Sequence, residues 1–180
     1  MSFSWKNGFS EEEWDHVIRV RRIQLGEADL LRQIRLESLR EAPYAFGATY
    51  DAVVQRNEET WREKADSTAQ GSDGATFFVF SDEMPIGMAA LLRIPDQAEA
   101  GELIQVWVST EYRGTRAAWN LLDTIFEWAE ENHFQRIIAG VTKGNDRALK
   151  FYTNYGFSIS NELSAGDKGG VYLVKEVKSG

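Results

Sequence analysis

The segment from Val108 to Leu122 constrains the fold most, because an apolar strand passes there through a short polar turn into an amphipathic helix. Arg113 and Gly114 lie at the joint between the two. The first backbone N–H groups of a helix have no partner within the helix, and its N-terminus carries a partial positive charge. Arg113 and Arg116 lie beside these N–H groups, so the sequence predicts that the phosphates of a ligand bind here.

Composition excludes several classes of protein. A chain of 180 residues with 43% apolar residues is expected to form a single domain, residues 1–180, with residues 1–16 as an N-terminal arm. The formal net charge of -8 argues against nucleic-acid and membrane partners, both of which need clustered Lys and Arg. The absence of cysteine removes thiol nucleophiles, disulfides and thiolate zinc sites, and with two histidines no metal is expected. No leader-like or membrane-length apolar run occurs, so we expect a cytoplasmic location.

Apolar periodicity divides the chain into alternating strands and helices. Strands are predicted at 17–24, 76–81, 86–93, 102–108, 136–142, 157–163 and 171–177, and helices at 28–40, 58–69, 116–131 and 146–155. Such an order is typical of an α/β sandwich with a mixed sheet.

A second group of motif residues lies about thirty residues beyond the turn at Arg113 and Gly114. It begins with Asn145 after a predicted strand, continues through Phe151 and Tyr152, and ends at Gly156 and Phe157. Asn145 or Asp146 is suited to cap the predicted helix at its start, and Gly156 is suited to end it.

Both groups of residues resemble motifs of the GNAT superfamily, the acetyl-CoA-dependent N-acetyltransferases. The Arg-Gly turn with its strand and helix resembles the family's pyrophosphate motif, and residues 145–157 resemble its Asn-x-x-Ala-x-x-Phe-Tyr-x-x-x-Gly-Phe element. Residues 19–21 and 36–47 resemble its first strand and helix. The resemblance implies a mostly antiparallel sheet of six to seven strands flanked by about four helices. It also implies acetyl-CoA as co-substrate and a primary amine of a small molecule or protein as acceptor.

The resemblance assigns roles to individual residues. Tyr152 would be the general acid for the departing CoA thiolate, and Asn145 would hold the pantetheine arm or order the loop. Backbone groups of a splayed strand would pair with the pantetheine, and the turn would hold the diphosphate. These cofactor-binding residues are Val106, Trp107, Val108, Arg113, Gly114, Thr115, Arg116, Ala117 and Ala118. An amine attacks a thioester directly in a ternary complex, so the chain needs no nucleophile.

Arg116 departs from the family pattern, which has glycine at that place in the turn. Glycine tolerates positive φ and lets the backbone approach a phosphate closely, whereas the Cβ of arginine crowds the ligand. Alternatively, the Arg116 guanidinium pairs bidentately with a phosphate. The sequence leaves both alternatives open.

Glu102, at the start of the predicted strand, is the first candidate for the general base. Period-two alternation puts Glu102, Ile104, Val106 and Val108 on one face and Leu103, Gln105 and Trp107 on the other. If the Glu102 face turns away from the acceptor, Gln105 is expected to order a water in its place.

Phe46 and Tyr50 follow the first predicted helix, where relatives shape the acceptor cleft, and they either contact substrate or pack in the core. The N-terminal arm carries Trp5, Phe9 and Trp14, which would cover either the cleft or a partner subunit in a homodimer.

Two other functions are alternatives to the enzyme. A non-catalytic acyl-CoA-binding or sensing module would keep the phosphate site and need neither Tyr152 nor a base. An unrelated nucleotide-binding fold is disfavoured, because the chain has neither a Gly-x-x-x-x-Gly-Lys-Ser/Thr loop nor a Gly-x-Gly-x-x-Gly after a strand.

Overall fold

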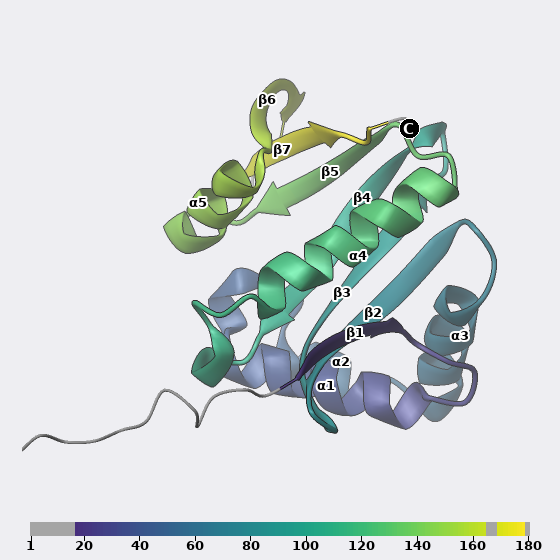
Figure 1. Ribbon diagram of the computed structural model, residues 1–180. Coiled ribbons are helices and arrows are strands. Elements are labelled where there is room, and N and C mark those ends of the chain that lie inside the picture. The colour runs from purple at the N-terminus through teal and green to yellow at the C-terminus, as the bar shows by residue number, and fades with distance from the viewer. Residues whose placement is uncertain (1–16, 165–168, 179–180) are drawn as a thin grey trace, which may run out of the picture.

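A seven-stranded sheet runs through the middle of the molecule, with helices on both of its faces (Figure 1). The computed structural model describes residues 17–164 and 169–178, so the N-terminal arm with Trp5, Phe9 and Trp14 lies outside the described residues. Neighbouring strands are antiparallel except for β4 and β5, and the order across the sheet is β1-β2-β3-β4-β5-β7-β6. The strands are β1 (Ile18–Arg22), β2 (Gly74–Ser81), β3 (Met84–Ile94), β4 (Gln97–Val108), β5 (Arg136–Val141), β6 (Ser158–Ser164) and β7 (Val171–Glu176). This confirms the predicted mixed, mostly antiparallel sheet.

Five α-helices occur in the described part of the chain, one more than predicted. They are α1 (Ala28–Glu41), α2 (Tyr50–Val54), α3 (Glu58–Ala69), α4 (Ala117–Glu131) and α5 (Asp146–Tyr155), with 3₁₀ turns η2 (Pro43–Ala45) and η3 (Thr110–Tyr112). Helix α2 was missed because its five residues are too few to show a helical period, although Thr49 caps it by accepting the N–H of Ala52 at 3.3 Å. None of these helices is long and apolar enough to cross a membrane.

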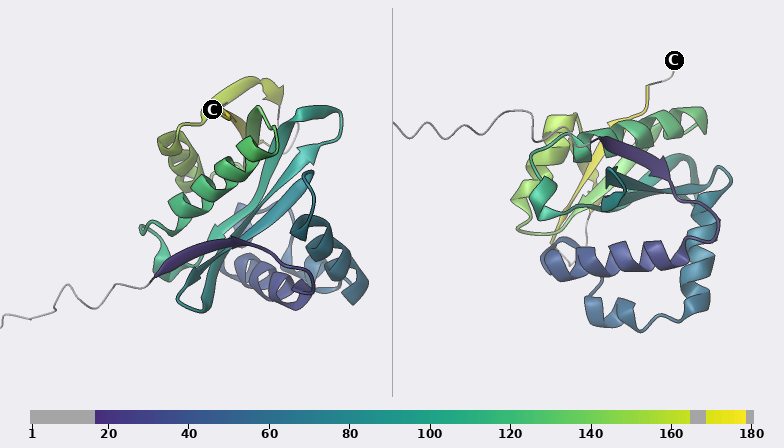
Figure 2. Two further views of the ribbon diagram at one scale, coloured as in Figure 1. Left: turned by 45° about the vertical axis from the view of Figure 1, so that its right-hand side comes forward. Right: turned by 60° about the horizontal axis from the view of Figure 1, so that its bottom comes forward.

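Two hydrophobic cores lie on opposite faces of the sheet. Along β2, Phe77 and Val79 join the core beneath α4, whereas Phe78 and Phe80 join the core beneath α1, α2 and α3. All eight residues of β2 are buried, because helices cover both faces of this strand (Figure 2). The strand therefore reads as a continuous apolar run.

Strands β4 and β5 separate partway along their length. They pair in parallel only from Ala100 to Leu103 of β4, so the last five residues of β4, 104–108, have no strand on that side. β7 pairs with the other edge of β5 along its whole length, from Arg136 to Val141. The edge of β4 that faces β5 is therefore unpaired after Leu103. A strand that splays away from its neighbour, as predicted for the pantetheine-binding strand, has such an edge.

A β-bulge at Gln105 reverses the predicted faces of β4. Between Ile104 and Trp107 the strand advances three residues while β3 advances two, and Gln105 adopts a φ of 57°. Leu103 therefore lies in the core beneath α4, while Trp107 lies in the core beneath α1. The prediction that Leu103, Gln105 and Trp107 share one face is wrong, as is the matching prediction for Glu102, Ile104, Val106 and Val108, because the extra residue breaks the period of two.

Helix α5 has the predicted bounds. The Asn145 side-chain oxygen accepts the N–H of Ala148 at 3.2 Å, which satisfies one of the free donors at the helix start. Gly156 ends the helix at a φ of 110°, a left-handed conformation that favours glycine. These two residues fix where Tyr152 lies along the helix.

Candidate active site

Two adjoining cavities lie where β4 and β5 separate. The first, of about 180 Å³, reaches from the start of α5 to the loop before α4. The second, of about 420 Å³, lies along β4, β5 and β7. Both are lined by Ala45, Phe46, Val106, Asn145, Ala148 and Tyr152, so the cavities meet at these six residues. A ligand lying in one cavity can therefore present an end group to the other.

The loop before α4 presents unpaired backbone donors. Within the described residues, the N–H groups of Gly114, Arg116, Ala118 and Trp119 form no hydrogen bond, and we call these four groups the amide cradle. Gly114 has a φ of 79°, and a Cβ built there would meet no atom within 4 Å. The N–H of Ala117 is taken by the Thr115 hydroxyl at 3.2 Å. The cradle thus presents free backbone donors at a helix start, and Gly114 supplies the left-handed turn that exposes them.

The backbone at Arg116 does not require the glycine that the family pattern has there. Its φ of −74° is ordinary for an L residue, so no glycine is needed there. The side chain is exposed and is not among those that line the first cavity. Thr115 and Ala117 also lie outside the cavity lining and act on the loop backbone.

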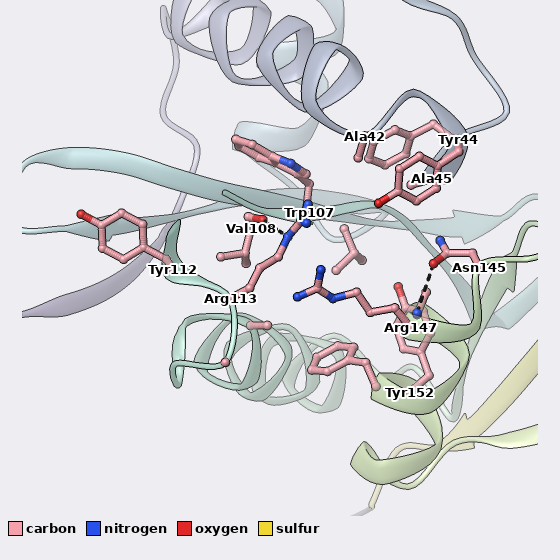
Figure 3. A pocket seen from close by; sticks show the side chains of 16 residues that line it. Ala42, Tyr44, Ala45, Trp107, Val108, Tyr112, Arg113, Asn145, Arg147 and Tyr152 are labelled. Atoms are coloured by element: carbon pink, nitrogen blue, oxygen red, sulfur yellow. Dashed lines mark hydrogen bonds between the residues drawn. The ribbon is translucent and has the colours of Figure 1, made fainter. Parts of the chain in front are cut away.

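Two guanidinium groups line the first cavity. Arg113 is held by its own loop, because Nε donates to the Val108 carbonyl at 3.2 Å. Arg147, at the start of α5, extends into the cavity and forms no ion pair in the described part of the chain (Figure 3). The sequence predicts no role for Arg147, although this residue lies two positions after Asn145 in the family-like motif. Positive charge therefore reaches the cavity from both of its ends.

Glu41 ties the end of α1 to the loop after β4. Its carboxylate accepts the Trp107 indole N–H at 2.7 Å and the Thr110 N–H at 2.9 Å, and lies 3.4 Å from the Arg113 guanidinium. Burial alone would raise the pKa of this carboxyl, but these donors and the charge of Arg113 together hold the pKa below its ordinary value. Nothing in the local sequence indicates this role, because the partners lie more than sixty residues away.

Tyr152 is buried where the two cavities meet. Its ring packs against Phe151 and Phe157, with centroids 5.5 Å and 5.3 Å away, and the residue is 6% exposed. Burial raises the pKa of the phenol above its ordinary value. The hydroxyl has no hydrogen bond to any described residue. A phenol in this setting stays protonated near neutral pH and is free to donate to a ligand.

Asn145 contributes to the site first as a cap. Its side-chain oxygen is engaged with the N–H of Ala148, while its amide nitrogen has no partner within the described residues (Figure 3). Val106, Trp107 and Val108 line the same cavity along the unpaired edge of β4. The structure thus brings the predicted backbone-binding strand, Asn145 and Tyr152 together.

The second cavity contains most of the residues predicted to face the acceptor. Glu102, Gln105 and Phe46 all line it, Glu102 being exposed and the other two half-buried. Tyr50 lines neither cavity, and its ring lies under the Arg40 guanidinium, 4.6 Å from centroid to Cζ. The structure therefore brings Glu102, Gln105 and Phe46 together and leaves Tyr50 apart from them.

Comparison with known proteins agrees with this geometry. Residues 33–157 match the family model described as "Acetyltransferase (GNAT) family". The chain has no significant match among curated proteins.

Solved structures share the fold at low sequence identity. An acetyltransferase of the GNAT family from Streptococcus pneumoniae superposes with a TM-score of 0.73 at 18% identity, covering 90% of this chain and 100% of that one. The PaiA N-acetyltransferase from Thermoplasma acidophilum, in complex with coenzyme A, superposes with a TM-score of 0.73 at 17% identity. The match covers 89% of this chain and 99% of that one. The GNAT domain of PAT from S. lividans superposes with a TM-score of 0.69 at 19% identity. The match covers 88% of this chain and 90% of that one.

Proposed function

The chain belongs to the acetyltransferase (GNAT) family, and from this premise we propose that it transfers the acetyl group of acetyl-CoA to a primary amine. The amine attacks the thioester directly while both substrates are bound. The observation that carries the proposal is the meeting of two cavities at Tyr152, because a transferase needs a place where one substrate's reactive end reaches the other's.

The first cavity offers what the CoA part of the substrate requires. The amide cradle, Arg113 and Arg147 suit a diphosphate. The unpaired edge of β4 offers backbone donors and acceptors for the pantetheine amides, and the free amide nitrogen of Asn145 adds a donor. Acetyl-CoA supplies the activated acetyl group, and these residues hold and orient it.

Two protons must be managed during the transfer. A lysine-like amine has an ordinary pKa of about 10.4, so presenting it neutral at pH 7 costs about 4.6 kcal/mol. Glu102 takes up that proton directly or through water, with Gln105 placed to order the water. Tyr152, which is protonated, gives its proton to the departing sulfur, and the proton that the nitrogen loses as the amide forms restores the phenol.

A thiol-release assay with acetyl-CoA over a panel of amines tests the proposal, with isothermal titration of acetyl-CoA run beside it. We expect binding and acetyl-CoA-dependent release of free CoA with at least one amine. Binding without turnover on any amine would favour a non-catalytic acyl-CoA sensor. Absence of both binding and turnover would overturn the assignment of the first cavity.

A further inference from the structure

Arg35 is a buried cation that lines the second cavity without a carboxylate partner. It lies on α1 and is 4% exposed. Its Nη1 donates to the Ser38 hydroxyl at 3.3 Å, and its Nε is buried with no acceptor among the described residues. No ion pair joins Arg35 to any acidic residue in the described ranges, Glu102 of the same cavity included. A guanidinium has five donors, and those of Arg35 other than the one bonded to Ser38 have no acceptor among the described residues.

A second arginine strengthens the positive potential beside it. Arg56 follows α2, lies with its Cζ 5.8 Å from the Trp61 ring centroid, and forms no ion pair within residues 17–164 and 169–178. Burial, together with the charge of Arg56, lowers the pKa of Arg35 to about 10, which still leaves Arg35 protonated at pH 7. The two like charges thus act on one another, and neither has an ion pair among the described residues.

Packing alone does not offset the burial of this charge. The Arg35 Cζ lies 4.4 Å from the centroid of the Phe46 ring, a cation–π contact that stabilises the guanidinium in part. A buried charge with an orphaned donor remains costly unless an anion completes its hydrogen bonds. The free form therefore has the arrangement expected of an anion site before its ligand binds.

The two charges of the second cavity complement a zwitterion. Arg35 supplies a fixed cation, and Glu102 on β4 supplies an anion that lines the same cavity. We propose that the acceptor is an amine that also carries a carboxylate, as an amino acid does, with its carboxylate paired to Arg35. A planar guanidinium pairs bidentately with a carboxylate, which fixes the orientation of the acceptor as well as its charge. The amine end then lies toward Tyr152, where the second cavity meets the first. This inference rests on the proposed acetyltransferase function.

Matched pairs of acceptors test the proposal directly. The wild-type protein is assayed with natural amino acids and with the carboxamide of each, which keeps the amine and the side chain and removes the negative charge. We expect kcat/KM for the preferred amino acid to exceed that for its carboxamide at least tenfold. Equal kcat/KM values within every pair would overturn the proposal.

Substitution of Arg35 then assigns the preference to this side chain. Arg35→Gln is expected to lower kcat/KM for the amino acid roughly 30-fold or more, mainly through KM, because it removes one partner of a buried charge pair. Its kcat/KM for the carboxamide should change less than about threefold. Equal losses for both acceptors would mean that Arg35 only supports the packing of Phe46. If Arg35→Gln does not fold, Arg56→Gln takes its place, with a smaller loss confined to the amino acid.

A binding readout separates this proposal from the acetyltransferase proposal. The Nε–H signal of Arg35 is followed by NMR in the CoA-saturated protein during titration with N-acetylglycine or N-acetylglycinamide. We expect the carboxylate to shift the signal and the carboxamide to leave it unchanged. A shift without turnover of any amine would contradict the proposed function while supporting the carboxylate site. Turnover with no shift would contradict the carboxylate site alone.

Discussion

Tyr152 combines the two properties that a donor to a departing thiolate needs. It lies where both cavities meet, and its hydroxyl has no hydrogen bond to a described residue. Its raised pKa means that it loses its proton only above its ordinary value of about 10, so the donor form persists across the working range of pH. Any alkaline loss of activity below pH 10 must therefore come from another group.

We expect Tyr152→Phe to lower kcat about 100-fold and to leave the Kd for CoA within about twofold, because only the hydroxyl is removed. Steady-state kinetics and isothermal titration measure the two quantities. Tyr155→Phe is the matched control, since the Tyr155 hydroxyl donates to Asp123 at 2.7 Å and lines neither cavity. A collapse of CoA affinity with unchanged kcat would show that Tyr152 is a packing residue.

Helix α5 carries Tyr152, so the cap at its start matters for both stability and binding. Asn145→Ala should destabilise the protein by about 1 kcal/mol, measured by urea unfolding, because the N–H of Ala148 loses its acceptor. Asn145→Asp keeps an acceptor and should restore that stability. If the amide nitrogen of Asn145 also binds the pantetheine, Asn145→Asp will raise the KM for acetyl-CoA despite normal stability. An unchanged KM in Asn145→Asp would limit Asn145 to its capping role.

Glu41 joins α1 to the loop that carries Arg113, and its effect should depend on pH. Glu41→Gln is expected to lower the free energy of unfolding by about 1–2 kcal/mol at pH 7, because charged hydrogen bonds to Trp107 and Thr110 are weakened. The pKa of Glu41 is lower in the folded protein than its ordinary value of 4.5. The Glu41 carboxylate therefore stabilises the folded protein above pH 4.5, and this stabilisation is lost as the pH falls through the folded-state pKa.

Denaturant unfolding at pH 7 and at stepwise lower pH measures this dependence, with Glu37→Gln as the control one turn earlier on α1, where the side chain is exposed. The difference in the free energy of unfolding between the wild type and Glu41→Gln should become smaller below pH 4.5. A difference that stays constant with pH would mean that the carboxylate charge plays no part.

Local signals in the sequence predicted the elements that end in caps or turns. Asn145 and Gly156 gave α5 its bounds, because a capping side chain and a left-handed glycine act within one helical turn. The bulge in β4 was not predictable in the same way, since Gln105 is not a residue type that usually adopts a positive φ. That single extra residue reversed the faces assigned to Trp107 and its neighbours.

At the scale of the whole molecule, the site depends on contacts between distant segments. The cradle, the strand and Tyr152 could be predicted because each belongs to a continuous motif. Glu41 and Arg35 could not, because α1 meets the site only through contacts with segments distant in the sequence (Figure 1). Neither residue carries a local pattern that distinguishes it from a solvent-exposed helical charge.

The negative net charge of the protein affects how the cavities can bind anionic substrates. With a formal net charge of -8, the protein repels anions at long range, so an anionic substrate must be held by local groups. Arg113, Arg147 and the Gly114 and Ala118 amides of the cradle supply such groups in the first cavity, and Arg35 supplies one in the second.

A crystal structure of the protein with CoA tests the central claim most directly. The diphosphate should lie on the amide cradle, the pantetheine should follow the unpaired edge of β4, and the sulfur should lie within hydrogen-bonding distance of the Tyr152 hydroxyl. CoA bound outside the first cavity, or a sulfur beyond the reach of that hydroxyl, would contradict the claim.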